Sequence, residues 1–163
     1  MKRDIVILGG GPGGYTAAEM AVKSGFSTVV VEMNTLGGVC LNKGCIPTKA
    51  LYKEAELINN MIEASEHGVP LDGFQIDIET MKLRKDNVIQ KLREEIQKKM
   101  DSNGIEIING IGSIKDKNHV VVKKHDEELE IEAKYIIIAT GSKPEKIDVP
   151  GNDLEGVITC EHM

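Results

Sequence analysis

The 163-residue sequence has no long hydrophobic run, no excess of positive charge and only three cysteines. Its longest apolar run, residues 135–139, is far shorter than the roughly 20 residues that cross a membrane. A formal charge of −6 argues against a nucleic-acid-binding surface, which needs clustered lysine and arginine. The apolar stretch after Asp4 is too short for the core of a signal peptide. These absences predict a cytoplasmic protein that binds neither nucleic acid nor membrane.

Two of the three cysteines, Cys40 and Cys45, lie close together in the string LGGVCLNKGCIPTK at residues 36–49. Structural disulfides are rare in the cytoplasm, so such a pair is more typical of a catalytic or metal site. The spacing allows a disulfide if the turn between the cysteines is tight. A zinc site needs two further ligands, and no paired metal spacing is found among the remaining candidates, which are Cys160, His67, His119, His125 and His162. A redox pair is therefore favoured over a bound metal or a buried pair of structural thiols.

The amino-terminal residues have the pattern of a strand–helix–strand unit in a parallel sheet. Residues 4–8 predict a buried strand, residues 9–14 are a glycine-rich turn, and residues 15–24 predict a helix. Residues 28–31 predict a second strand, which ends at Glu32. This is the βαβ pattern of α/β proteins.

The remaining sequence predicts two helices followed by short strands. Apolar spacing indicates helices over residues 51–62 and 88–100, the second with charged side chains such as Arg93 on its solvated side. Three strands, at 105–108, 119–123 and 129–133, predict an antiparallel meander, and residues 135–139 predict a further, fully buried strand. The predicted fold is α/β and Rossmann-like, with helices on a parallel sheet and a three-stranded antiparallel meander as an insertion.

Gly9, Gly11 and Gly14 form a GxGxxG pattern, which by itself is often only a turn. Here it follows a strand, opens a helix and precedes a carboxylate, Glu32, at the end of the next strand. This context is typical of a dinucleotide site, in which the helix N-terminus stabilises a pyrophosphate and the carboxylate accepts from a ribose hydroxyl. A carboxylate repels a 2′-phosphate, so NAD or FAD is favoured over NADP. The cysteine pair then favours FAD, because a flavin can exchange two electrons with a dithiol.

The string GGVCLNKGCIPTKAL resembles the redox-active segment of the FAD-dependent pyridine nucleotide–disulfide oxidoreductases. Within that family it most resembles the dihydrolipoamide dehydrogenases. Glutathione and mercuric reductases share the architecture but usually have Val where Leu41 and Ile46 stand here. The resemblance extends to YIIIATGSKP at residues 135–144, which is similar to the family's second FAD motif. It implies that residues 1–163 are the amino-terminal, FAD-binding part of such an enzyme, without the nicotinamide-binding and dimerisation domains.

The resemblance also implies roles for individual residues. Cys45 would be the thiol beside the flavin, and Cys40 the thiol that exchanges with the substrate disulfide. Lys49 would approach the flavin ring, although it also fits a solvated lysine of a first helical turn, and Cys160 would be a bystander with a free thiol. The implied cofactor-binding residues are Gly9, Gly11, Pro12, Gly13, Gly14, Glu32, Met33, Gly37, Gly38, Val39, Cys40, Lys49, Gly112, Thr140 and Gly141.

The implied activity is reoxidation of dihydrolipoamide, with electrons passing through the cysteine pair and FAD to NAD. The implied partners are a lipoyl carrier protein, or the lipoyl domain of a 2-oxo acid dehydrogenase or glycine cleavage complex, and a second subunit in a homodimer. We expect the 163-residue chain to be a piece that is inactive alone. The alternatives are another reductase of the family, of the glutathione or mercuric type, and a non-catalytic flavin-binding module.

Overall fold

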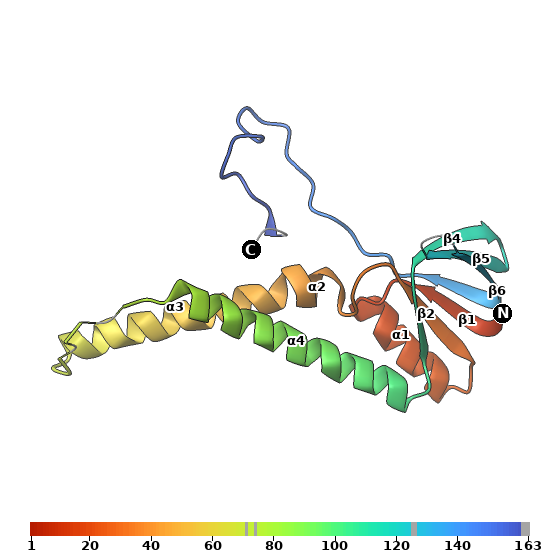
Figure 1. Ribbon diagram of the computed structural model, residues 1–163, viewed down its shortest axis with the longest axis horizontal. Coiled ribbons are helices and arrows are strands. Elements are labelled where there is room, and N and C mark those ends of the chain that lie inside the picture. Colours follow the sequence, from red (N-terminus) through yellow and green to blue (C-terminus); the bar gives the residue numbers. More distant parts are fainter. Residues whose placement is uncertain (71, 74, 125–126, 161–163) are drawn as a thin grey trace.

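The computed structural model describes residues 1–70, 72–73, 75–124 and 127–160, and its centre is a six-stranded sheet (Figure 1). The strands are β1 (Lys2–Leu8), β2 (Thr28–Glu32), β3 (Glu106–Asn109), β4 (Ile111–Asp116), β5 (His119–Lys124) and β6 (Glu127–Ile138). Their order across the sheet is β3-β2-β1-β6-β5-β4. Strands β3, β2, β1 and β6 pair in parallel, whereas β6, β5 and β4 pair in antiparallel fashion. The predicted α/β class and the parallel core are confirmed.

Strand β1 lies at the centre because its residues are apolar on both faces. Ile5 and Ile7 pack with helix α1 (Pro12–Lys23), whereas Val6 and Leu8 pack against strands β5 and β6 on the other face. Strand β2 is buried along its whole length, as expected for an inner strand of a parallel sheet. The core therefore has two layers of side chains, one on each face of β1 and β2.

Three further helices follow the first βαβ unit. Helix α2 (Gly38–Lys43) is short, and α3 (Cys45–Glu66) and α4 (Ile78–Ser102) are long. Figure 1 shows α3 and α4 running side by side away from the sheet, and an ion pair between Arg84 and Glu54 joins them. The helices predicted around residues 51–62 and 88–100 are thus confirmed and extend further. Within the described ranges, no helix combines the length and apolar character that a membrane span requires.

The antiparallel meander has three strands, but one predicted strand does not belong to it and one of its strands was not predicted. Residues 105–108 were expected in the meander, yet β3 pairs in parallel with β2, with Val30 opposite Ile107. The first strand of the meander is β4, which was not predicted because its alternation is weak and most of its residues are exposed. Pairing with β5 makes it a strand.

The strands predicted at residues 129–133 and 135–139 are one continuous strand, β6. Its first part pairs with β5, and most of its length pairs with β1. The second part was expected to be fully buried, yet Tyr135 is 60% and Ile138 67% exposed. Successive side chains of a strand point to opposite faces, so Tyr135 and Ile138 lie on different faces of the sheet and both faces are partly open here. Helix α1 packs mainly against β1 and β2.

A polar cluster fixes the amino-terminal end of the sheet, opposite to the glycine turn. Asp4 accepts hydrogen bonds from the Ser27 N–H at 2.9 Å and the Ser27 hydroxyl at 2.7 Å. Its other carboxylate oxygen pairs with Lys134 Nζ at 2.6 Å. The hydrogen bond from Lys134, followed by those from Ser27, holds the pKa of Asp4 well below its usual value. These contacts join β1, β6 and the residue that precedes β2.

Candidate functional site

The glycine turn between β1 and α1 brings two segments of backbone unusually close. A Cβ at Gly9 would stand 2.2 Å from the Ala139 carbonyl oxygen, and Gly9 itself has a φ of +106°. A Cβ at Gly14 would stand 1.8 Å from the Gly9 carbonyl oxygen. The first and third glycines of the pattern are therefore required by close approach of the backbone to itself.

Helix α1 begins with its backbone N–H groups uncapped by any side chain. Its N-cap is Gly11, and Pro12 stands at the start of the helix. The first N–H groups of a helix have no partner within the helix, and they carry a partial positive charge. An anionic phosphate is stabilised at such a position. The bare helix end therefore fits the pyrophosphate predicted from the GxGxxG pattern.

Glu32 lies at the carboxyl end of β2 and is only 8% exposed. One carboxylate oxygen accepts from the Gly10 N–H at 2.6 Å, and the other accepts from the Asn34 N–H at 2.8 Å. The side chain thus fixes the glycine turn and the segment after β2 at the same time. A carboxylate has about four lone-pair directions, so these two bonds leave capacity for ribose hydroxyls.

These elements enclose a cleft of about 660 Å³ at the carboxyl ends of the parallel strands. This is the edge at which α/β proteins bind their ligands. The predicted cofactor-binding residues that line the cleft are Gly9, Gly11, Pro12, Gly13, Glu32, Met33, Gly38, Val39, Cys40, Thr140 and Gly141. The cleft is also lined by residues outside that list: Asn34, Thr35, Asn42, Lys43, and Ala139, Ser142 and Lys143 of the string similar to the second FAD motif.

A recess of about 80 Å³ shares Gly9, Glu32, Met33 and Thr140 with the cleft. It also contains Gly112, another of the cofactor-binding residues that the resemblance implied. A Cβ at Gly112 would stand 2.6 Å from the end of the Leu8 side chain, so a larger residue here would have to displace that side chain. The two hollows therefore adjoin each other at the carboxyl ends of β1 and β2.

Four predicted site residues do not line either hollow. Gly14 packs beneath Gly9, and Gly37 donates its N–H to the Gly10 carbonyl at 2.9 Å. Both residues therefore support the glycine turn without lining the cleft. Cys45 is the first residue of α3, and Lys49 follows on the same helix with an exposed side chain. The predicted approach of Lys49 to a flavin ring stays a prediction.

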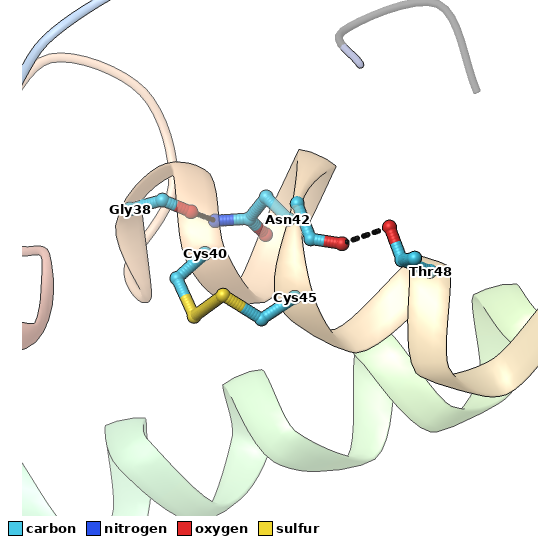
Figure 2. The surroundings of a disulfide bond; sticks show 6 residues. Gly38, Cys40, Asn42, Cys45 and Thr48 are labelled. Carbon is cyan, nitrogen blue, oxygen red and sulfur yellow. Dashed lines mark hydrogen bonds between the residues drawn. A yellow bond between two sulfur atoms is a disulfide. The ribbon is translucent and has the colours of Figure 1, made fainter.

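The structure joins Cys40 and Cys45 by a disulfide, with their Cα atoms 4.8 Å apart (Figure 2). The predicted pairing is confirmed, and Cys160 is a free thiol as expected. Cys40 lies on α2 and lines the cleft, whereas Cys45 is exposed at the first position of α3. A thiolate at the N-terminus of a helix is stabilised, which lowers its pKa. The disulfide thus joins α2 to the start of α3 at the edge of the cleft.

Arg93 was predicted to lie on the solvated side of α4, and this prediction was wrong. The side chain is half-buried, and its Nε donates to the Asn42 side-chain oxygen. Helical periodicity along α4 could not show this contact, because α2 comes from a distant part of the sequence. No group of three or more His, Cys, Asp or Glu residues in the described ranges could hold a metal ion.

Gly14 and Gly13 provide a matched test of the glycine turn. We expect Gly14→Ala to destabilise the fold by at least about 1–3 kcal/mol, because its Cβ would overlap the Gly9 carbonyl oxygen. A Cβ at Gly13 would meet only the Ala139 Cβ at 3.9 Å, so Gly13→Ala should not lower the free energy of unfolding. Urea denaturation of both variants measures the difference. Equal destabilisation of the two variants would contradict this account of the turn.

Comparison with known proteins agrees with these features. The family profile described as pyridine nucleotide-disulphide oxidoreductase matches residues 3–163. A dihydrolipoyl dehydrogenase of Chlamydia muridarum is 40% identical over 141 residues, covering 86% of this chain and 30% of the relative. That of Bacillus subtilis is 39% identical over 162 residues, covering 94% and 34%. That of Acholeplasma laidlawii is 39% identical over 150 residues, covering 91% and 43%.

A solved structure shares the fold. It is titled as a Cu(II) complex of the HOCl-induced flavoprotein disulfide reductase RclA from Escherichia coli, and it superposes with a TM-score of 0.75 at 28% identity. The match covers 93% of this chain and 31% of the other. The chain therefore spans about a third of the length of most of these relatives.

Proposed function

The chain belongs to the pyridine nucleotide–disulphide oxidoreductase family, and from that premise we propose that residues 1–163 form the FAD-binding, disulfide-bearing domain of a dihydrolipoamide dehydrogenase. The observation that carries the proposal is the Cys40–Cys45 disulfide at the edge of a cleft with a glycine turn and a buried ribose-type carboxylate. The names of the relatives support the choice of substrate.

Three features of the cleft and its recess support FAD as the ligand. The uncapped N-terminus of α1 would hold the pyrophosphate, and Glu32 would accept from the adenosine ribose. Gly112 in the smaller recess would let the adenine ring approach the backbone. Bound FAD supplies a two-electron carrier between the cysteine pair and NAD⁺.

The cysteine pair would accept electrons by thiol–disulfide exchange. A thiolate of dihydrolipoamide attacks the Cys40 sulfur, which breaks the bond to Cys45 and leaves a mixed disulfide and a Cys45 thiolate. The second substrate thiol then loses its proton and attacks the substrate sulfur of the mixed disulfide, which releases Cys40 and closes the lipoamide ring. Two electrons have passed to the cysteine pair, the two substrate protons have gone to the solvent or to the released cysteine thiolates, and the substrate has become a disulfide.

The helix end at Cys45 favours this direction of bond breaking. Cys45 is the first residue of α3, so the thiolate that leaves in the first step is stabilised by the helix N-terminus. A thiol with a lowered pKa is also the better leaving group. Attack at Cys40, with departure of Cys45, is the assignment that this geometry supports.

The partners and location follow from the same proposal. The substrate would be carried by a lipoyl carrier protein or by the lipoyl domain of a multienzyme complex in the cytoplasm. The complete enzyme would be a homodimer with NAD as its electron acceptor. In that enzyme residues 1–163 contribute the flavin groove and the disulfide.

A thiol count on the 163-residue chain tests the proposed electron acceptor. We expect one free thiol, from Cys160, in the isolated protein under denaturing, non-reducing conditions, and three after treatment with dihydrolipoamide. Reduced glutathione at the same thiol concentration serves as the control and should reduce the pair less completely. A count that stays at one after dihydrolipoamide, or that is already three beforehand, would contradict the proposal.

Two further measurements distinguish the proposed enzyme from a flavin-binding module and from a glutathione or mercuric reductase. Binding of FAD with no reduction of the cysteine pair by dihydrolipoamide would favour a non-catalytic flavin-binding module. Full-protein assays with glutathione disulfide and Hg²⁺ would identify a reductase of the other types. The proposal expects turnover with dihydrolipoamide and NAD⁺ and none with these two substrates.

A further inference from the structure

The side chain of Asn42, which lies between the two cysteines in the sequence, is hydrogen-bonded at both of its ends. Its amide nitrogen donates to the Leu36 carbonyl at 3.0 Å and to the Gly38 carbonyl at 2.8 Å. Figure 2 shows the bond to Gly38. Both amide protons are then used, so the side-chain oxygen needs a donor from elsewhere. Arg93 of α4 supplies it through its Nε atom. The segment that carries Cys40 is thereby tied to a helix far along the chain.

Helix α2 depends on a contact of this kind, because it is too short to be stable by itself. It has six residues, and isolated helices shorter than about 12 residues are marginal in water. No side chain caps its N-terminus, and Leu41 is its buried residue. Its position therefore depends on tertiary contacts, and the Arg93–Asn42 hydrogen bond is a charged contact of this kind.

The position of α2 matters most when the disulfide is open. Cys40 lies on α2 and Cys45 on α3, so after reduction the two thiols are no longer linked through their sulfurs. How readily they close again depends on how often they meet, which is their effective concentration. Fixing α2 against α4 keeps the Cα atoms close to their separation of 4.8 Å and so favours the disulfide.

We propose that Arg93 is a positioning residue of the Cys40–Cys45 pair: through Asn42 it holds the two thiols at bridging distance and makes the pair harder to reduce. This inference rests on the proposed function, since it concerns the same pair of sulfurs. Arg93 would influence the redox equilibrium of the two cysteines although its helix, α4, does not line the cleft.

The test measures the redox equilibrium of the 163-residue chain in buffers of reduced and oxidised dithiothreitol. Reduction opens the protein disulfide to two thiols, while dithiothreitol loses the same two electrons and two protons and closes to its cyclic disulfide. Alkylation and mass spectrometry count the free thiols at each ratio. We expect Arg93→Met to be half-reduced at a reduced-to-oxidised ratio about tenfold lower than the unchanged chain, which corresponds to about 30 mV. Arg93→Lys, which keeps a charged donor, should restore part of the difference.

A matched control is available on the same helix. Arg84 of α4 pairs with Glu54 of α3 at 2.8 Å, so it also links two helices through a charged contact. This contact is to α3 and not to α2. Arg84→Met should leave the redox equilibrium unchanged. Circular dichroism of both variants checks that each remains folded. A second variant, Asn42→Ala, should reproduce the shift of Arg93→Met, and the double variant should shift no further.

Three results would overturn the proposal. One is an unchanged equilibrium in Arg93→Met, and another is an equal shift in Arg84→Met, which would indicate general loosening of the helices. The third is a shift towards a more stable disulfide, which would mean that the guanidinium acts on the thiolate by charge rather than by position. The measurement contains neither flavin nor dihydrolipoamide, so its outcome is independent of the test of the proposed function.

Discussion

Replacing Cys40 by Ser is expected to abolish turnover of dihydrolipoamide in the full protein and to leave a long-wavelength charge-transfer band in its oxidised flavin spectrum. Without its partner, Cys45 remains a thiol or thiolate, and a thiolate in contact with the oxidised ring shares electron density with it. Cys45→Ser should be equally inactive but should lack the band at every pH. Absorbance spectra of the two purified variants, recorded across a pH series, measure this difference.

The pH dependence of the band reports the ionisation of Cys45. The band requires the thiolate, so it should fade as the pH falls through the pKa of this thiol. Because Cys45 is the first residue of α3, we expect a midpoint below the free-thiol value of about 8.5. A midpoint at or above that value would show that the end of the helix does not stabilise the thiolate.

A control variant and a contrary outcome complete this test. Cys160 is a free cysteine outside the disulfide and the cleft, so Cys160→Ser should keep both activity and an unchanged flavin spectrum. The cleft is lined by Cys40 rather than Cys45, so the assignment of Cys45 as the sulfur beside the flavin needs a direct test. A band found in Cys45→Ser and missing from Cys40→Ser would reverse the two roles.

Glu32→Ala is expected to weaken FAD binding by the full protein by about 10- to 150-fold. This range corresponds to the roughly 1.5–3 kcal/mol that one hydrogen bond to a charged group contributes. The variant also removes the acceptors of the Gly10 and Asn34 N–H groups, so the turn around the pyrophosphate should loosen and the free energy of unfolding should fall. Titration of the apoprotein with FAD, followed by flavin fluorescence, measures the affinity.

Glu19 offers a matched control for the loss of a buried carboxylate. It is 8% exposed, as Glu32 is, but it pairs with Lys99 on the far side of α1 and does not line the cleft. Glu19→Ala should lower the stability of the fold while leaving the affinity for FAD unchanged. Equal loss of affinity in both variants would mean that general loosening is responsible, and unchanged affinity in Glu32→Ala would remove Glu32 from the site.

The βαβ unit and its glycine turn could be predicted because their signals are local. The spacing of Gly9 and Gly14, a strand before them and Glu32 after the next strand all lie within one stretch of sequence. The Cβ positions show why substitution is not tolerated there, since two of the contacts are to backbone oxygens. The cysteine pair is local as well, because a separation of five residues across a turn already limits the distance between the two sulfurs.

The errors lie where the answer depends on a partner distant in the sequence. β3 has the composition of any short strand, and its place beside β2 rather than in the meander is decided by which edge of the sheet is free. β4 has a weak pattern and becomes a strand through hydrogen bonds with β5. Arg93 has the helical position of a solvated residue until α2 is placed against it.

The sequence alone determined the α/β class, the glycine turn and the pairing of the two cysteines, because residue type and short spacing specify them through sterics and chemistry. The tertiary structure decided the order of the strands, the enclosure of the cleft and the contact of Arg93 with Asn42. It also showed that Glu32 supports the turn through two backbone hydrogen bonds besides facing the cleft. Each of these depends on which surfaces meet when the chain folds, and no local pattern of residues contains that information.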